Sequence, residues 1–255
     1  MSIIKSLIIA FSLYSKIPMP QFEWKDEDLR YVTGFFPVVG AAVGGMFYLW
    51  FYIAETLNLP GTSRCFILAA LPLIITGGFH FDGFLDTSDA LSSYGDKEKK
   101  REILKDPHIG AFAFIRGLIA AAIYVAALFM AEDEKAALAI AGGFVLSRAL
   151  SALAVLCFPK MSDEGNVSYI SKRQNDKINL VLILMWMALS IAFELCNSVI
   201  IGVTVIAAAL ISFIYYRFMS QKQFGGISGD LAGYFVVICE IMICVFAGVF
   251  SFAMA

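Results

Sequence analysis

Charged residues are scarce in this chain. Asp, Glu, Lys and Arg make up 16% of its 255 residues, whereas apolar residues make up 60%. A soluble domain is about a quarter charged and about half apolar, and a water-soluble globule of this length has too little polar surface to cover so much apolar material. The excess must therefore face lipid, and the sequence predicts one integral-membrane domain over residues 1–255.

The sequence also lacks cysteines spaced as metal ligands and basic stripes of the kind that bind nucleic acid. The five cysteines are odd in number, lie in or at the ends of apolar runs and lack metal-ligand spacing, which predicts small buried side chains. The net charge is −2 and no basic stripe is interleaved with aromatics, so no nucleic-acid partner is expected.

The first apolar run, 3–14, contains Lys5 and no small-residue cleavage site. It is too short to span, so we expect an interfacial or re-entrant helix there.

Long apolar stretches recur along the rest of the chain, each close to the roughly 20 residues that a helix needs to cross a bilayer core. The predicted spans are 31–54, 64–79, 109–130, 136–158, 178–195, 198–216 and 231–254. These stretches exceed the length of barrel strands and do not alternate, so only helices are expected. The predicted fold class is therefore all-α: a polytopic membrane protein with about seven transmembrane helices and an N-terminal interfacial or re-entrant helix.

The basic residues predict the orientation of these spans. They concentrate in the N-terminal segment and in the three long loops after the second, fourth and sixth spans, while the alternate connections hold only Arg64 and Lys135. Cytoplasmic loops of membrane proteins carry the excess of Lys and Arg. We therefore expect the N-terminus and the long loops in the cytoplasm and the C-terminus outside, in the cell inner membrane. Gly40, Gly44 and Gly45 in the first span have small-xxx-small spacing, which favours a role in helix packing.

The strongest chemical signal is an acidic run at the cytoplasmic end of the second span. Asp82, Asp86 and Asp89 stand at i, i+4 and i+7, so on a helix their directions fall within about 60° of one another. Three like charges on one face repel and need an opposite charge. Magnesium prefers carboxylate oxygens together with substrate phosphate oxygens. The run therefore predicts an Mg²⁺ site formed by these aspartates.

A solvated cytoplasmic helix face is the other interpretation of the run. It predicts polar residues between the aspartates and lysines to pair with them, whereas Phe81, Phe84 and Leu85 lie between them and no base lies within reach along the helix. The metal interpretation is therefore favoured. His80 remains open: it could be a metal ligand, a proton carrier or a hydrogen-bonded packing residue.

A second motif, residues 105–110, stands at the start of the third span. Asp106 could cap that helix with Pro107 in its first position, or it could join the metal site, because this loop returns from the aspartate helix. Lys105 belongs to a basic stretch, 97–105, that satisfies the positive-inside rule and could also attract phosphorylated substrates or anionic lipid.

A third motif opens the last span, with Gly225, Gly226, Ser228 and Asp230. Glycines and a hydroxyl before a helix N-terminus can expose backbone N–H groups to an anion. A substrate phosphate is therefore one interpretation of this loop, and a plain turn is the other.

Glu240 lies ten residues beyond Asp230, about 15 Å into the membrane by helix rise. An unpaired carboxylate is costly there, so Glu240 should face the bundle interior. Arg148, in the middle of the fourth span, is a candidate partner. The two could form a structural pair or take part in function.

Five segments together resemble the cobalamin synthase family. The run 77–89 looks like its signature, 106–110 resembles its next block, and 11–20, 35–40 and 225–240 resemble its N-terminal, first-span and C-terminal patterns. The matches occur in order and cover nearly the whole chain. Lys16 stands where arginine is expected, Ser228 where threonine is usual, and segment 160–164 departs from an arginine-containing pattern.

The resemblance implies an adenosylcobinamide-GDP ribazoletransferase. Such an enzyme joins adenosylcobinamide-GDP to α-ribazole, or its 5′-phosphate, and gives adenosylcobalamin, or its phosphate, plus GMP. The implied step is attack of the ribose 5′-hydroxyl on the phosphorus attached to cobinamide. Asp82, Asp86 and Asp89 would hold Mg²⁺ against the diphosphate, and Asp89, Asp86 or His80 could take the proton. The substrates and the lipid bilayer are the expected partners, and a homo-oligomer is left open.

Two other functions share some of these features. CDP-alcohol phosphotransferases place spaced aspartates at a cytoplasmic helix end, but they carry Ala-Arg after the first Asp-Gly and a later aspartate pair, whereas Phe84 and Leu85 follow here. Ion-coupled transporters show paired halves with interrupted helices. No such pairing is visible, and these aspartates lie at the membrane edge.

Overall fold

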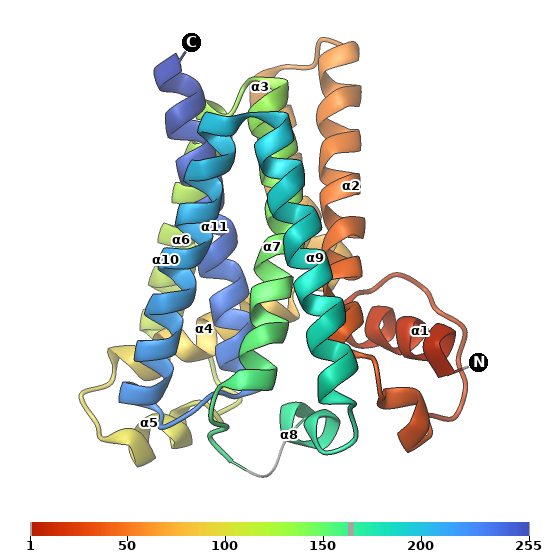
Figure 1. The fold of residues 1–255 in the computed structure, drawn as a ribbon. Helices are drawn as coiled ribbons and strands as arrows, with labels where there is room; N and C mark the ends of the chain where they lie inside the picture. The colour runs from red at the N-terminus through yellow and green to blue at the C-terminus, as the bar shows by residue number, and fades with distance from the viewer. Residues whose placement is uncertain (1, 163–165, 255) are drawn as a thin grey trace.

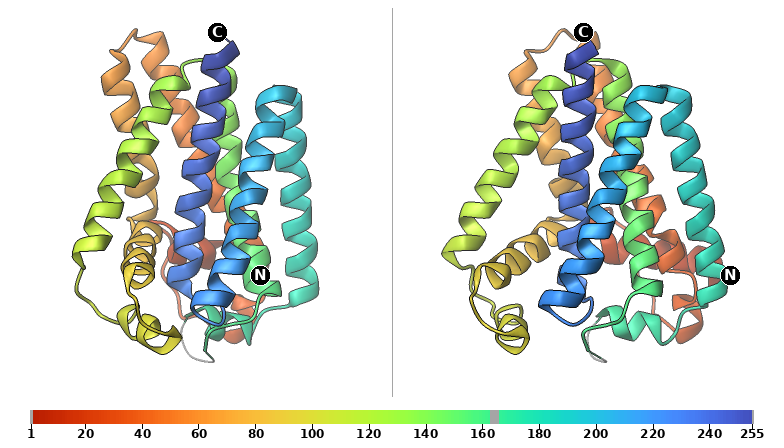
Figure 2. Two further views of the ribbon diagram at one scale, coloured as in Figure 1. Left: turned by 90° about the vertical axis from the view of Figure 1, so that its left-hand side faces the viewer. Right: turned by 60° about the vertical axis from the view of Figure 1, so that its left-hand side comes forward.

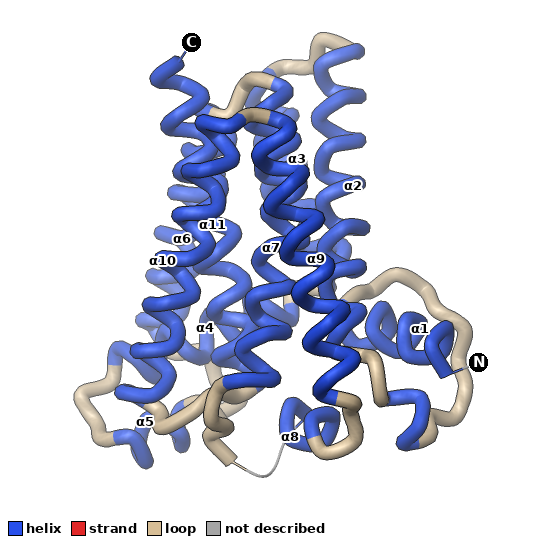
Figure 3. The backbone as a smooth tube through the Cα atoms, viewed as in Figure 1, coloured by secondary structure: helices blue, strands red, loops and turns tan. Residues whose placement is uncertain are grey.

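The computed structural model describes residues 2–162 and 166–254, which form helices and connecting loops without a strand (Figure 3). The predicted all-α class is confirmed. The α-helices are α1 (Ser2–Tyr14), α2 (Phe36–Thr56), α3 (Gly61–Thr76), α4 (Phe79–Ser92), α5 (Lys97–Ile103), α6 (Ala111–Met130), α7 (Glu134–Cys157), α8 (Asn166–Ser171), α9 (Asp176–Asn197), α10 (Val199–Gln223) and α11 (Gly229–Met254). Two 3₁₀ turns, η1 (Asp26–Leu29) and η2 (Thr33–Phe35), precede α2. The departing segment 160–164 lies partly outside the described residues.

The long helices form a multi-pass bundle. Within the described residues, 6 helices are long and apolar enough to cross a membrane, ending at Thr56, Met130, Cys157, Asn197, Gln223 and Met254. The short α4, α5 and α8 gather at one end of the bundle with α1, and the C-terminus and the α2–α3 connection lie at the other (Figures 1 and 2). The segments expected to be cytoplasmic therefore share one end, as the charge pattern predicts.

The predicted second span, 64–79, corresponds largely to α3, and the chain bends sharply where α3 ends. Helices α3 and α4 meet at 95°, so α4 lies across the bundle instead of continuing along it. Gly77 and Gly78, between the two helices, have φ angles of +70° and +78°, which glycine adopts without steric cost. The carbonyl of Ile75 near the break accepts a hydrogen bond from the Lys16 N–H at 2.7 Å. The segment after α1 thereby satisfies a backbone group that a membrane would leave unpaired.

Small residues bring α2 against α7 in the centre of the bundle. A Cβ at Gly40 would overlap the backbone of Phe144, and one at Gly44 would overlap the backbone of Ala141. The predicted packing role is confirmed for Gly40 and Gly44. For Gly45 the prediction is wrong, because a Cβ there would meet open space.

The expectation for the cysteines is only partly correct. Cys65, Cys239 and Cys244 are buried, as predicted. Cys157 and Cys196 are exposed, because each is at the end of its helix, where packing against neighbours is less complete.

Candidate active site

The aspartate run forms an acidic stripe along one face of α4. Asp82 is exposed and Asp86 and Asp89 are half-buried, whereas Phe84 and Thr87 on the other side of the helix are buried. This division follows from the spacing, since residues four and seven apart share a helical face. Carboxylate oxygens therefore remain accessible on a helix whose reverse side is anchored in the bundle.

A fourth carboxylate comes from the start of α11. A Cβ at Gly83 would lie 2.7 Å from the carbonyl oxygen and 2.9 Å from the Cα of Asp230, so the two backbones touch there. Tyr234 stacks on Phe84 with ring centroids 5.5 Å apart, which holds the next turn of α11 on the same helix. Glycine at position 83 thus allows Asp230 to lie beside the stripe. We call Asp82, Asp86, Asp89 and Asp230 the carboxylate cluster.

The carboxylate cluster carries negative charge without a basic partner. Burial, followed by the charges of Asp82, Asp230 and Asp89, raises the pKa of Asp86 to about 6. None of the ion pairs in the described part of the chain involves a cluster member. An approaching cation would relieve this repulsion.

Magnesium fits the chemistry of the carboxylate cluster. All its donors are carboxylate oxygens, the ligands that hard divalent cations prefer. Within the described residues, no three His, Cys, Asp or Glu side chains are already arranged to hold a metal ion by themselves. Mg²⁺ is commonly held by one or two carboxylates together with substrate phosphates and water, rather than by an all-protein cage. The residues therefore suit an ion that arrives with a diphosphate.

The loop before α6 reaches the cluster through Gly110. A Cβ at Gly110 would overlap the Asp89 carboxylate, so a larger residue would displace that side chain. Gly110 is also the N-cap of α6, which begins at Ala111. The prediction that Asp106 caps this helix is therefore wrong, because four residues separate Asp106 from its first turn.

Asp106 instead closes a local turn with His108. Its Oδ1 accepts a hydrogen bond from the His108 N–H at 3.0 Å and lies 2.7 Å from the ring Nδ1. These hydrogen bonds lower the pKa of Asp106, whose side chain is 55% exposed. None of the contacts in the described residues joins Asp106 to the carboxylate cluster, and its role as a metal ligand stays a prediction.

His80 lies on the face of α4 opposite the aspartates. Its ring centroid is 3.9 Å from that of Phe79 and 5.6 Å from that of Phe36. Burial, and to a lesser extent the charge of Arg148, lowers its pKa well below the usual value. Of the three interpretations left open by the sequence, a packed neutral ring fits this position, whereas metal ligation together with the stripe does not.

The glycine-rich loop uses most of its N–H groups within the protein. Gly225 donates to the carbonyl of Gln221 at 3.2 Å, Gly226 to that of Ser220 at 3.3 Å, and Ile227 to that of Pro159 at 2.9 Å. The predicted anion-binding loop therefore cannot use these three N–H groups, because each already donates to a carbonyl of the protein. In the first turn of α11, the Leu231 N–H donates to Ser228 Oγ at 3.3 Å and the Ala232 N–H donates to the Ser228 carbonyl at 3.0 Å. Few N–H groups therefore remain for an anion near Asp230.

The basic stretch 97–105 anchors the end of α10. Lys97 donates to the carbonyl of Gln221, Lys100 to the side chain of Gln223, and Arg101 twice to the carbonyl of Phe224. These cations lie at a helix C-terminus, where positive charge is favourable. Lys105 is exposed beyond them, and its predicted role in binding an anion stays a prediction.

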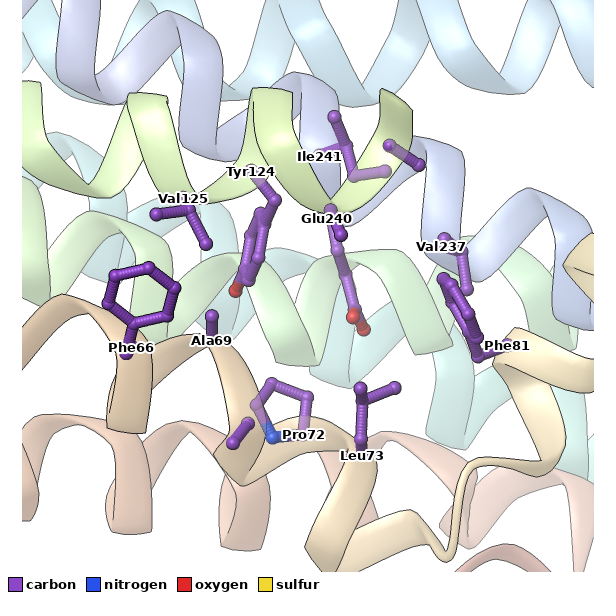
Figure 4. Close-up of a pocket in the computed structure, with 13 residues that line it drawn as sticks. Phe66, Ala69, Pro72, Leu73, Phe81, Tyr124, Val125, Val237, Glu240 and Ile241 are labelled. Carbon is purple, nitrogen blue, oxygen red and sulfur yellow. The ribbon is translucent and has the colours of Figure 1, made fainter. Parts of the chain in front are cut away.

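The suggested pair of Glu240 and Arg148 is confirmed. Arg148 Nη1 lies 2.5 Å from Glu240 Oε1, and Ser147 Oγ also donates to that oxygen at 3.3 Å. Figure 4 shows that Glu240 and Tyr124 both point into a pocket of about 290 Å³ between α3, α6 and α11. We call it the membrane pocket.

Two features were missed by the sequence interpretation. Glu194 is fully buried, and its carboxylate oxygens have no hydrogen-bonding partner among the described residues; a lone acid in an apolar run was the available signal. The second feature is a pocket of about 200 Å³ beside Asp230, which we call the aromatic pocket. Its residues include Tyr14, Phe36, Phe79, His80, Ser151 and Asp230. They come from five helices, so no local pattern reveals it.

Gly83→Ala tests whether the contact between α4 and α11 forms the carboxylate cluster. The new methyl group would meet Asp230 backbone, which cannot rotate away, so we expect α11 to shift, a destabilisation of about 1–3 kcal/mol and a large loss of activity. Thermal unfolding and turnover in detergent would measure both. Gly45→Ala is the matched control, since its methyl group meets nothing within 4 Å and should raise stability slightly. Equal activity of the two variants would contradict the prediction.

Comparisons with known proteins converge on one family. Residues 6–248 match the family model described as cobalamin-5-phosphate synthase. An adenosylcobinamide-GDP ribazoletransferase from Lachnoclostridium phytofermentans is 41% identical, over 94% of this chain and 91% of the relative. A protein of the same name from Clostridium perfringens is 33% identical, over 92% of this chain and 94% of the relative. Another from Shewanella woodyi is 28% identical, over 88% of each chain. No solved structure matches the chain.

Proposed function

The chain belongs to the cobalamin-5-phosphate synthase family, and from this premise we propose that it is an adenosylcobinamide-GDP ribazoletransferase of cobalamin biosynthesis. The structural observation that supports this most is the carboxylate cluster of α4 and α11, which has accessible oxygens and no basic partner among the described residues. Transfer of a cobinamide phosphate between a diphosphate and a nucleoside needs positioning and charge neutralisation. The cluster offers both at one end of a membrane bundle.

The reaction makes one P–O bond and breaks another. A ribose hydroxyl of α-ribazole, or of its 5′-phosphate, attacks the phosphorus attached to cobinamide, and the bond from that phosphorus to GMP breaks. An acceptor that already carries a 5′-phosphate, and whose product keeps it, cannot attack through its 5′ oxygen. The attacking group is then a secondary ribose hydroxyl, which corrects the 5′-hydroxyl expected above.

One or two of Asp82, Asp86 and Asp230 would hold Mg²⁺ together with the diphosphate. What supports this role is that Asp82 is exposed and that the charges of Asp82 and Asp230 both act on Asp86. When bound, the ion would neutralise charge on the diphosphate and on departing GMP. Asp89 lies at the Gly110 end of the stripe, where its carboxylate can accept the hydroxyl proton. The carboxylate would then release that proton to solvent. The phosphate of the departing GMP would exchange protons with water according to the pH.

The end of the bundle that carries the cluster faces the cytoplasm in this proposal. The N-terminal segment and the basic loops lie at that end (Figure 1), which agrees with the positive-inside rule. Nucleotide substrates are made in the cytoplasm and do not cross a bilayer. The cell inner membrane, with the C-terminus outside, is therefore the proposed location.

Purified protein in proteoliposomes tests the proposed function directly. The expected result is that adenosylcobinamide-GDP, α-ribazole and Mg²⁺ together give GMP and a corrinoid carrying the lower base, in equal amounts. Chromatography with mass detection would identify both products. Release of GMP without the new corrinoid would indicate a hydrolase and would overturn the proposal.

Removal of divalent cations is expected to stop turnover reversibly. EDTA should abolish GMP release because the cluster's negative charge then repels the diphosphate, and added Mg²⁺ should restore it. Titration of Mg²⁺ against the initial rate gives the apparent affinity, and thermal unfolding in EDTA checks that the fold survives. Undiminished turnover in EDTA would show that the carboxylate cluster does not act through a metal ion.

A further inference from the structure

The aromatic pocket lies beside the carboxylate cluster but on the reverse side of α4. Asp230 belongs to both, since it contributes to the pocket lining and to the charge around Asp86. His80 faces the pocket from the side of α4 opposite the aspartates. One end of a molecule bound in the aromatic pocket would therefore lie next to the carboxylate cluster, where the reaction is proposed to occur.

Four rings form one wall of the aromatic pocket. The ring centroids of Tyr14 and Phe36 are 4.3 Å apart, those of Tyr14 and Phe79 are 6.2 Å apart, and those of Phe79 and His80 are 3.9 Å apart. Leu13, Val155 and Ile170 add aliphatic surface. Offset and edge-on ring contacts favour a flat aromatic guest.

Two buried polar side chains face this pocket without a partner. His80 is 6% exposed and Ser151 is 2% exposed, and both line the cavity. None of the hydrogen bonds among the described residues involves either side chain, and neither belongs to the fully buried unpaired atoms, so both are accessible from the cavity. Buried polar groups are normally paired, and each of these can donate one hydrogen bond. They point to a ligand with an acceptor atom on a ring.

The size and polarity of the pocket restrict the ligand further. A volume of about 200 Å³ is below the roughly 300 Å³ at which pockets for drug-sized ligands begin, so it suits a ring system rather than a whole nucleotide. Guanine presents a row of donors and acceptors along its edges, whereas most of the pocket lining is aromatic, aliphatic or glycine and only a few side chains, such as His80, Ser151 and Asp230, are polar. A base with one free ring nitrogen and an apolar body fits better.

We propose that the aromatic pocket binds the base of the acceptor nucleoside, a benzimidazole-type ring with a single unsubstituted nitrogen. This inference rests on the proposed function. Ser151 or His80 donates a hydrogen bond to that nitrogen, and the rings of Tyr14, Phe36 and Phe79 cover the faces of the base. The ribose then extends past Asp230 toward the carboxylate cluster.

The membrane pocket is the alternative location for the base. It also presents a hydroxyl without a partner among the described residues, that of Tyr124, beside Glu240 (Figure 4). Glu240 lies about 15 Å along α11 from Asp230, however, and Phe66 and Leu73 of its lining are exposed on the surface of the bundle. A nucleoside bound there would place its ribose far from the cluster.

Ala152→Leu tests the proposal because Ala152 lines the aromatic pocket and is 1% exposed. Leucine would occupy space that the base needs, so the KM for α-ribazole should rise by at least about tenfold. The KM for adenosylcobinamide-GDP should stay unchanged. A riboside with a smaller base, such as imidazole, should lose less than α-ribazole does.

Ala121→Leu is the matched control, since Ala121 lines the membrane pocket. It should leave both KM values unchanged. A rise in the KM for α-ribazole in this variant, but not in Ala152→Leu, would overturn the proposal in favour of the membrane pocket. Equal rises for both substrates in Ala152→Leu would also overturn it. Absence of turnover in the unmodified protein would instead count against the proposed function.

Ser151→Ala keeps the test decisive if Ala152→Leu does not fold. Removal of one hydroxyl from a cavity wall changes little in packing, and it should weaken equilibrium binding of α-ribazole by about five- to tenfold. Equilibrium dialysis without the corrinoid substrate measures this in the absence of turnover. Unchanged affinity in Ser151→Ala, together with unchanged affinity in His80→Phe, would overturn the proposal.

Discussion

Asp86→Asn is expected to lower the turnover number about 10³-fold or more while the fold survives. Asp86 is the member of the carboxylate cluster on which the charges of all three others act. Asparagine has nearly the same shape but no charge, so a cation between the cluster and the diphosphate would be held less strongly. Loss of one negative charge should also relieve repulsion within the folded protein. Stability should therefore stay the same or rise while activity falls.

Initial rates of GMP release and thermal unfolding of the same preparations separate these two effects. Asp176→Asn is the matched control, because Asp176 is an exposed aspartate in the first turn of α9 at the same end of the bundle. It should keep nearly full activity. Wild-type turnover in Asp86→Asn, at limiting Mg²⁺, would remove the carboxylate cluster from the mechanism.

Arg148→Met should destabilise the bundle by about 3–5 kcal/mol, because it leaves the Glu240 carboxylate without its cation. Arg148 is 1% exposed, and its substitution removes the hydrogen bond from its Nη1 to Glu240 Oε1. The rings of Phe36 and Phe144 lie 5.9 Å and 5.7 Å from its guanidinium carbon and lose a cationic neighbour as well. Denaturant unfolding in detergent, followed by circular dichroism, measures the loss.

A second substitution shows how much of this loss comes from the stranded charge. Adding Glu240→Leu to Arg148→Met should restore most of the stability, since two apolar side chains of similar volume replace a buried ion pair. The coupling free energy follows from the double-mutant cycle. Strictly additive losses would mean that the two side chains stabilise the bundle independently, in spite of the 2.5 Å separation of their charged atoms.

The helices illustrate what local sequence predicts well and where it fails. The span predicted at 178–195 is the 22-residue α9, and its apolar length was sufficient evidence. The predicted second span, 64–79, corresponds to α3 but ends at Thr76 because Gly77 and Gly78 adopt left-handed φ angles, whereas glycines within the other described helices do not break them. Whether a glycine bends a helix depends on what satisfies the freed backbone groups, and here that is a segment about 60 residues earlier in the chain.

The Asp106 motif shows the same limit at a helix start. Asp followed by Pro is a frequent beginning of a helix, yet α6 begins after Gly110. The Asp89 side chain lies against that glycine, and Asp106 is occupied by His108. Local capping preference was overridden by a contact with another helix.

The sequence by itself determined the membrane class, the alternation of the loops and the acidic stripe on α4, because hydrophobic length, basic-residue bias and helical spacing are local properties. Only the tertiary structure decided that Asp230 lies beside the stripe, that His80 faces away from it, and that rings from α1, α2 and α4 line one pocket with Ser151 of α7. Those contacts join residues far apart along the chain. They depend on how helices bend and pack, which the spacing of residues within one helix does not specify.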